Sequence, residues 1–203
     1  MSLAIRKATE GDIPALSRIC LLTADAGQSA ESLHDFKELP GLIFAIPYVK
    51  LPTTWAFVLV DESKEGEVVG YVVGSKDTRE FERYAMEHWW PPLAAKYPPS
   101  LAVKEGDAKY MKMLQGMFTA PEPNIAFAAA HLHINILPEY QGKGWGRKMI
   151  NAAIEYLKGE NIKGNGVWLG MDPRNVNARD FYHKMGFKPI QGVPDTNVGL
   201  KFT

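Results

Sequence analysis

The chain has 203 residues, of which 46% are hydrophobic and 23% charged, values typical of a folded globular protein that exclude a disordered or fibrous chain. Lys plus Arg and Asp plus Glu both number 23, so no overall positive field exists to hold nucleic acid or an anionic membrane surface. We therefore expect one domain over residues 1–203 whose partner is a small molecule.

The first 75 residues predict a β-α unit followed by a β-hairpin. Leu3 and Ile5 alternate with other residue types as in a short strand, and residues 9–12 (TEGD) resemble the capping box that begins a helix. Residues 55–60 and 67–73 are strand-like runs separated by a polar, glycine-containing stretch. This pattern is typical of an antiparallel hairpin.

The single cysteine, Cys20, is predicted to fill the core of the protein. It has helical spacing with Ile13, Leu16 and Ile19, and one cysteine excludes an internal disulfide framework. The sequence has neither a charged-then-apolar leader nor an apolar run of about 18 residues. We therefore expect a cytoplasmic protein that does not span a membrane.

A helical insertion is predicted at about residues 78–120, because the apolar spacing becomes helical there. Proline pairs at 91–92 and 98–99 interrupt this stretch. The two apolar faces consist of Phe81, Tyr84, Ala85 and His88, and of Tyr110, Met113, Leu114 and Met117. The insertion separates the third predicted strand from the fourth.

The remaining elements alternate between strands and helices. We predict a strand at 129–137, a glycine loop, a helix with its apolar stripe at 149–157, a strand at 167–171, a helix at about 175–185 and short strands near 187–190 and 197–202. The order strand, glycine loop, helix is the one that nucleotide-binding sites use.

The glycine loop lies within PEYQGKGWGRKMI, residues 138–150. Backbone N–H groups exposed by such a loop, with the positive end of a helix behind them, favour a phosphate ligand. Gly142, Gly144 and Gly146 are each two residues apart, which does not match the dinucleotide fingerprint G-x-G-x-x-G. The nucleoside-triphosphate pattern G-x-x-x-x-G-K-[ST] is also missing from the sequence.

Two motifs resemble the GNAT N-acetyltransferase superfamily. Residues 141–146 (QGKGWG) are similar to its Q/R-x-x-G-x-G/A loop, which cradles the pyrophosphate of coenzyme A. Residues 175–187 (NVNARDFYHKMGF) resemble its N-x-x-A-x-x-x-Y-x-x-x-G-F helix, with Asn175, Ala178 and Tyr182 in register. This resemblance implies the GNAT fold, an α/β (α+β) protein whose mixed, mostly antiparallel sheet is flanked by helices.

The resemblance also implies acetyl-CoA as the cofactor. The backbone N–H groups of the loop should face its pyrophosphate, and the main chain from Ile134 to Leu137 should face the pantetheine, as an added strand would. Lys143 and Arg147 are candidates to pair with phosphates or are solvated surface cations. The implied cofactor-binding residues are Ile134, Ile136, Leu137, Gln141, Gly142, Lys143, Gly144, Trp145, Gly146, Arg147, Asn175, Ala178 and Tyr182.

A narrower resemblance concerns the GNAT-like domains that occur as free-standing bacterial and fungal proteins and fused to some O-GlcNAc hydrolases. The stretches HLHINILPEYQGKGWG, GVWLGMDP and KDTREFE, and the Trp-Trp-Pro-Pro of the insertion, are similar to that subgroup. Some of its members are suspected of lacking acetyltransferase activity. Three functions are therefore carried forward: a direct acetyl transfer to a small-molecule or peptide amine, an inactive module that binds acetyl-CoA, and a transferase that uses another acyl-CoA or an oxygen acceptor.

Acetyl transfer needs an acid for the departing sulfur and a base for the amine. Tyr182 matches the family's tyrosine near the sulfur, although it also shares an apolar helical face. The two strand positions at which family members often carry Glu or His hold Ala130 and Leu132, which cannot take a proton. His131 and His133 are one position out, so alternation predicts that they point away unless a bulge shifts the register.

Two carboxylates at strand ends are the remaining base candidates. Asp172 and Asp77 act either as a base or counter-charge for the substrate, or as turn and cap residues. For the acceptor, the aromatic residues Tyr48, Trp89 and Trp90, with Asp77, are candidates to wall a binding cleft. The alternative is that these aromatic residues pack within the insertion.

Overall fold

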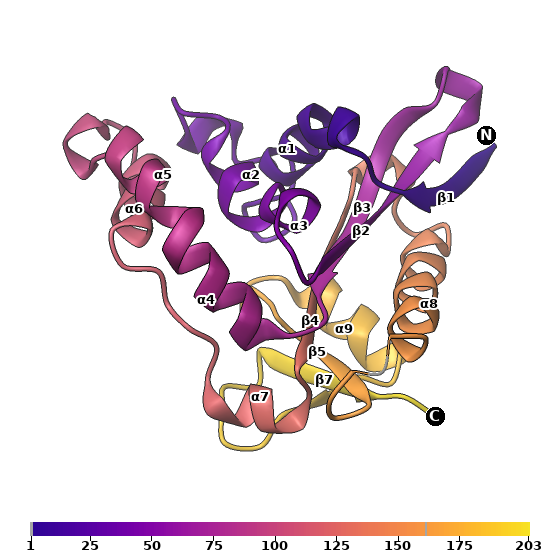
Figure 1. Ribbon diagram of the computed structural model, residues 1–203. Helices are drawn as coiled ribbons and strands as arrows, with labels where there is room; N and C mark the ends of the chain where they lie inside the picture. Colours follow the sequence, from indigo (N-terminus) through magenta and orange to yellow (C-terminus); the bar gives the residue numbers. More distant parts are fainter. Residues whose placement is uncertain (1, 161) are drawn as a thin grey trace.

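A single mixed sheet organises the computed structural model, which describes residues 2–160 and 162–203 (Figure 1). Within those residues seven strands form the sheet in the order β1-β2-β3-β4-β5-β7-β6. Their bounds are β1 (Leu3–Lys7), β2 (Thr54–Asp61), β3 (Glu67–Ser75), β4 (Ala130–Ile136), β5 (Gly166–Gly170), β6 (Lys188–Pro189) and β7 (Asn197–Lys201). All neighbours are antiparallel except β4 and β5, which confirms the predicted mostly antiparallel sheet.

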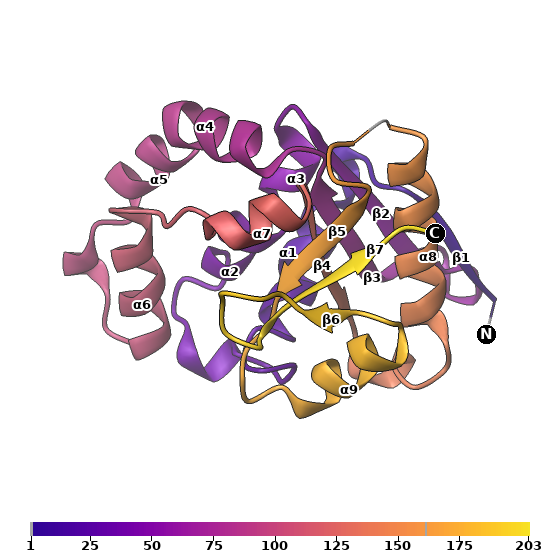
Figure 2. The ribbon, with the colours of Figure 1, turned by 90° about the horizontal axis from the view of Figure 1, so that it is seen from below.

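Helices cover both faces of the sheet. Helix α8 covers one face, while α1 to α3 and the insertion helices lie on the opposite side (Figures 1 and 2). Their bounds are α1 (Ile13–Leu21), α2 (Leu39–Phe44), α3 (Pro47–Lys50), α4 (Thr78–His88), α5 (Trp90–Lys96), α6 (Glu105–Leu114), α7 (Glu122–Phe127), α8 (Trp145–Lys158) and α9 (Val176–Lys184). Among the described residues, none of these helices combines the length and the apolar character that crossing a membrane requires.

The carboxylate of Asp12 stabilises the predicted β-α unit at the start of the chain. Asp12 accepts hydrogen bonds from the backbone N–H of Thr9 and from two guanidinium nitrogens of Arg6, at 2.7, 2.8 and 2.7 Å. The Arg6 hydrogen bonds lower the pKa of Asp12 to about 2, despite the opposing effect of burial. This capping box therefore joins β1 to the start of α1.

Cys20 lies in the hydrophobic core, as its spacing predicts. Its side chain is buried between α1 and the sheet with Leu16, Ile19 and Tyr71 in the same cluster. Burial raises the pKa of the thiol to about 11. A thiol that is protonated and buried is unreactive, so the role of Cys20 is to pack in the hydrophobic core.

The insertion between β3 and β4 contains four helices, α4 to α7. It extends to Phe127, seven residues beyond the expected end, because α7 follows Pro121 directly and continues almost to β4. Asp77 caps α4 by accepting from the backbone N–H of Glu80 at 3.1 Å. Residues 39–50, for which the sequence pattern predicts no element, form α2 and α3 and pack against this insertion.

Gly74 is expected to be indispensable to the packing of β3. A Cβ atom there would collide with the His131 carbonyl oxygen and the Trp55 ring. Gly74→Ala should therefore lower the free energy of unfolding by about 3 kcal/mol, measured by urea denaturation. Gly170→Ala is the matched control on β5, where the nearest atom to an added Cβ is Asn197 Oδ1 at 3.7 Å, so it should change stability by less than about 0.5 kcal/mol. Equal stability of the two variants would contradict this packing.

Candidate functional site

The glycine loop presents its backbone to solvent. Gly142 and Gly144 have φ angles of +71° and +81°, a region that L side chains rarely adopt, and both positions are exposed. Gly144 is the N-cap of α8, and within residues 2–160 and 162–203 no side chain caps that helix. The first N–H groups of α8 therefore remain available to an anion, as the motif predicts.

Side chains around the loop hold it in place. Gln141 donates to the carbonyl oxygen of Ile136 at 2.7 Å, which ties the loop to the end of β4. Lys143 donates to the Glu139 carbonyl at 2.7 Å, and Arg147 reaches the Lys184 carbonyl at 3.3 Å. Pairing of these two cations with phosphates stays a prediction.

Strands β4 and β5 pair at one end and then separate, and the point of separation is called the fork below. Among the described residues they pair only at Ala130 with Val167 and at His131 with Trp168. Beyond that point β4 continues along β3, while its other edge has no strand partner in the described chain. An open strand edge binds an extended ligand through main-chain hydrogen bonds. This edge contains Ile134, one of the residues expected to meet pantetheine.

Helix α9 packs against the glycine loop and carries Tyr182. Asn175 caps α9 by accepting from the N–H of Ala178 at 3.0 Å. The Phe181 ring lies so close to Gly146 that an added Cβ would approach it to 3.1 Å. Tyr182 is 7% exposed, and its burial raises the pKa of its phenol. Tyr182 lies outside the described lining of the cavity reported below, and its role as the acid stays a prediction.

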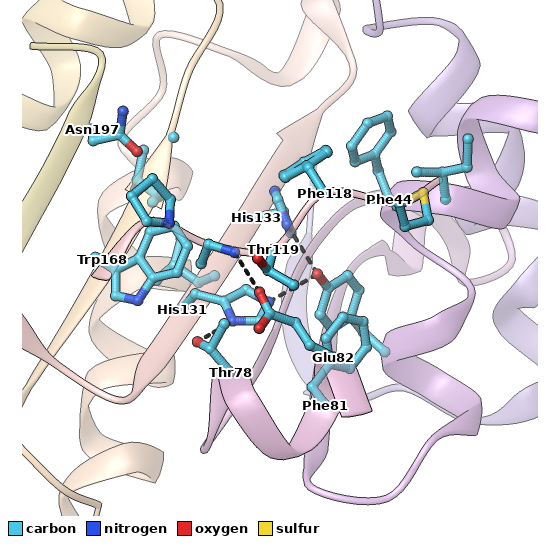
Figure 3. Close-up of a pocket in the computed structure, with 18 of the residues that line it drawn as sticks. Phe44, Thr78, Phe81, Glu82, Phe118, Thr119, His131, His133, Trp168 and Asn197 are labelled. Atoms are coloured by element: carbon cyan, nitrogen blue, oxygen red, sulfur yellow. Dashed lines mark hydrogen bonds between the residues drawn. The ribbon is translucent and has the colours of Figure 1, made fainter. Parts of the chain in front are cut away.

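A cavity of about 420 Å³ lies at the fork between the sheet and the insertion (Figure 3). Its walls come from α2, α3, α4, the start of α5, the segment 113–121, β4, β5 and the start of β7. Its size is that of a pocket for a small organic molecule. The cavity contains Tyr48 and Trp90 from the predicted acceptor residues, whereas Trp89 is outside the described lining and donates to the Leu42 carbonyl at 3.0 Å.

A chain of hydrogen bonds crosses the floor of this cavity (Figure 3). The Thr78 hydroxyl lies 2.6 Å from the Ala129 carbonyl oxygen and 2.7 Å from His131 Nδ1. The Tyr48 hydroxyl lies 2.9 Å from His131 Nε2 and 3.1 Å from His133 Nε2. The register of β4 against β3 contains no bulge, so His131 and His133 lie on one face of the strand, and both belong to the cavity wall together with Leu132.

The direction of every bond in this chain follows from its first member and from the charge of the two imidazoles. Two oxygens 2.6 Å apart need a hydrogen between them, and only Thr78 can supply one to the Ala129 carbonyl. Thr78 therefore accepts from His131 Nδ1–H. Burial lowers the pKa of both imidazoles, so both are neutral at pH 7. A neutral His131 accepts at Nε2 from the Tyr48 hydroxyl, the Tyr48 oxygen then accepts from His133 Nε2–H, and Nδ1 of His133 keeps a lone pair.

The two predicted carboxylates have other partners. Asp77 is the cap of α4, and Asp172 accepts from the backbone N–H, Nε and Nη2 of Arg174 at 2.9, 3.1 and 2.8 Å. These Arg174 hydrogen bonds lower the pKa of Asp172. Neither carboxylate belongs to the described lining of the cavity, although Thr78 and Met171 beside them do. Their role as a base stays a prediction.

The polar residues of the lining that the sequence analysis does not single out are Thr78, Glu82, Thr119, Trp168, Thr196 and Asn197. The only sequence signal for the cavity floor is the spacing of His131 and His133, which places both side chains on one face of a strand. Tyr48 joins them from 83 and 85 residues away in the chain. A contact of that separation leaves no local pattern.

Acid is expected to destabilise the protein between about pH 6.5 and pH 4. Burial lowers the pKa of His133 to about 4 and that of His131 well below its usual 6.5. In this pH range the unfolded chain binds protons at these histidines and the folded chain does not, so the free energy of unfolding falls as the pH falls. His133 alone contributes at most about 3 kcal/mol.

Urea denaturation at about pH 7 and about pH 4.5 measures this loss. The variant His133→Gln keeps a donor for Tyr48 and removes one titrating group, so it should lose less stability than the wild type between the two pH values. An identical loss in both proteins would contradict the low pKa of His133.

Comparisons with known proteins give one consistent result. A model of the Acetyltransferase (GNAT) family matches residues 33–187, about three quarters of the chain. The crystal structure of SsHAT is 33% identical, with a TM-score of 0.81 over 98% of this chain and 96% of that one. The PaiA N-acetyltransferase of Thermoplasma acidophilum, solved in complex with coenzyme A, is similar in fold, with a TM-score of 0.57, 14% identity and 100% coverage of both chains.

A curated relative matches the chain over a short segment. An uncharacterized N-acetyltransferase of Methanocaldococcus jannaschii is 37% identical over 65 residues, which are 32% of this chain. The match spans 28% of that relative's length.

Proposed function

Because the chain belongs to the GNAT family of acetyltransferases, we propose that it transfers the acetyl group of acetyl-CoA directly to a primary amine. One observation carries this proposal: the exposed start of α8 and the open edge of β4 lead to a cavity that is large enough for an acceptor. The pyrophosphate would bind the N–H groups of Gly142 to Gly146, and the pantetheine would run along β4 from Ile134 to Leu137.

The reaction forms a C–N bond and breaks the C–S bond of the thioester. The amine lone pair attacks the carbonyl carbon, one N–H proton leaves the nitrogen, and one proton goes to the departing sulfur. We assign the second proton to Tyr182, whose helix packs on the glycine loop through Phe181. Burial raises the pKa of the phenol, which keeps it protonated at neutral pH but makes it a weaker acid, so the transfer requires negative charge to develop on the sulfur beside it.

We propose His133 as the group that takes the amine proton, ahead of Asp172 and Asp77. His133 belongs to the described lining of the cavity, whereas the two carboxylates lie outside it. With a pKa of about 4, His133 is neutral at pH 7 but only weakly basic. It therefore suits the adduct formed after attack, whose positively charged nitrogen is far more acidic than the free ammonium ion.

The acceptor must enter as a neutral amine for this mechanism to operate. For an amine with a pKa of about 10.4, deprotonation at pH 7 costs roughly 4.6 kcal/mol. An apolar cavity favours the neutral form, because burial of an unpaired ammonium ion is unfavourable.

A second candidate function is an acetyl-CoA-binding module that transfers nothing. The observation that favours it is the fully buried pair Ala130 and Leu132, two aliphatic residues at the strand positions where a base is expected. Such a module would bind acetyl-CoA through the glycine loop and the fork, and it would not use His133 or Tyr182 for proton transfer.

Two measurements on the same preparation separate these functions. Calorimetry measures acetyl-CoA binding, and a thiol-release assay measures turnover against a panel of amines, amino sugars and lysine peptides. Binding with turnover supports the transferase, and binding without turnover across the panel favours the module. Failure to bind acetyl-CoA would overturn both.

A further inference from the structure

We infer that the acceptor is a monoamine carried on an apolar body of aromatic or branched-alkyl type, and that this cavity binds it. The inference rests on the proposed function and specifies its substrate class. Three observations support it: the cavity wall is mostly apolar, the carboxylate in the wall is already paired, and the side chains at the mouth are apolar.

The wall offers an apolar surface on nearly every side. Aromatic rings and methionine side chains dominate it, and such surfaces bind apolar or aromatic bodies and adapt to their shape. These side chains include Phe44, Phe81, Trp90, Met113, Met117 and Trp168. A sugar or a polyamine would leave most of its polar groups without partners against this surface.

The charge of the wall is already compensated. Glu82 is the one Asp, Glu, Lys or Arg side chain in the described lining, and its two oxygens accept from the N–H of Ala120 at 2.5 Å and from Arg79 at 2.7 Å. Arg79 also pairs with Glu122 at the surface. A second ammonium group on the acceptor would therefore find no unpaired carboxylate in the cavity, and burying it would be costly.

The imidazoles add no charge to the floor. Burial lowers the pKa of both His131 and His133, so both are neutral at pH 7. The lining therefore offers an amine the neutral imidazole of His133 and the neutral polar side chains of Thr119, Thr196 and Asn197, and no unpaired negative charge for a second ammonium group.

The mouth of the cavity has the same apolar character. Phe118 is 64% exposed and Met86 is 45% exposed, and both belong to the lining. Exposed apolar side chains at the rim of a pocket bind apolar ligands rather than charged ones. With a volume of about 420 Å³, the cavity holds an amine with a single ring or a short branched chain.

The test measures initial rates with acetyl-CoA for four amines of different body and charge. The probes are 2-phenylethylamine, cyclohexylmethylamine, spermidine and glucosamine. We expect kcat/KM for the two apolar monoamines to exceed that for spermidine and glucosamine by at least about tenfold. Direct calorimetric binding of the same four amines to the protein with coenzyme A gives a readout that does not depend on turnover.

A charge variant tests whether the cavity itself makes this choice. Met113→Glu places an unpaired carboxylate in the wall and should raise the affinity for spermidine relative to phenylethylamine by about tenfold. Lys112→Met changes the net charge by the same amount on the same helix, at an exposed position outside the described lining, and should leave the preference unchanged.

The outcomes separate the two proposals. Preference for spermidine or glucosamine in the wild type overturns the inference and leaves acetyl transfer standing. Selective binding of the monoamines without turnover supports the preference of the cavity for apolar monoamines and overturns the transferase, so the bound amine is then a ligand and not an acceptor. Absence of monoamine binding together with absence of turnover overturns both.

Discussion

The variant Tyr182→Phe is expected to lower kcat by about 100- to 1,000-fold while the Kd of acetyl-CoA changes by less than about twofold. Burial alone raises the pKa of the phenol, with no charged or titratable side chain hydrogen-bonded to it among the described residues, so its removal leaves no such group unsatisfied. Its ring would keep the contacts with Phe181 and Phe187, whose centroids lie 5.2 and 5.4 Å away. The change therefore removes a proton donor and little else.

Rates and binding are both needed to interpret this variant. Stopped-flow or steady-state thiol release gives kcat, calorimetry gives the Kd, and urea denaturation verifies that the fold is intact. Tyr84→Phe is a matched control on α4, outside the described lining of the cavity, and should leave kcat unchanged. If Tyr182→Phe retains full kcat, Tyr182 is a packing residue and sulfur takes its proton from elsewhere.

The variant His133→Gln is expected to lower kcat by about 100-fold with little change in the Kd of acetyl-CoA. Glutamine keeps a side-chain donor for the Tyr48 oxygen but carries no basic lone pair. Because the pKa of His133 is about 4, its protonation should inactivate the wild type only below about pH 5. Between that limit and neutral pH, the rate should follow the ionisation of the amine.

Variants of Tyr48, Asp172 and Asp77 are compared with His133→Gln by their loss of kcat. Tyr48→Phe removes the acceptor that fixes the His133 tautomer, so kcat should fall by about tenfold, a smaller loss than that of His133→Gln. Asp172→Asn and Asp77→Asn should each cost less than His133→Gln. A larger loss of kcat in either aspartate variant would move the base from His133 to that carboxylate.

Local sequence patterns predicted the strands and helices that surround the cofactor site. Alternating and helical apolar spacing placed β1, β2, β3, β4 and β5 and helices α1, α8 and α9 within a few residues of their bounds. The glycine positions in the loop follow from the positive φ angles of Gly142 and Gly144, which few other residues adopt. These features depend on neighbouring residues, so the sequence carries them directly.

The insertion and the segment before β2 were harder to predict. Helices α2 and α3 are six and four residues long and begin next to prolines, so they lack the repeated apolar period of a longer helix. Their role is to bring Tyr48 to β4, a contact that depends on packing rather than on local propensity.

The sequence by itself determined the glycine loop, the capped helix of Tyr182 and the absence of a base at Ala130 and Leu132. Each is a property of consecutive residues. Only the tertiary structure decided that β4 and β5 separate after two residue pairs, and that Tyr48, Thr78 and two histidines share one directed chain of hydrogen bonds. Strand register and contacts across more than 50 residues arise from the packing of the whole core, which no short segment encodes.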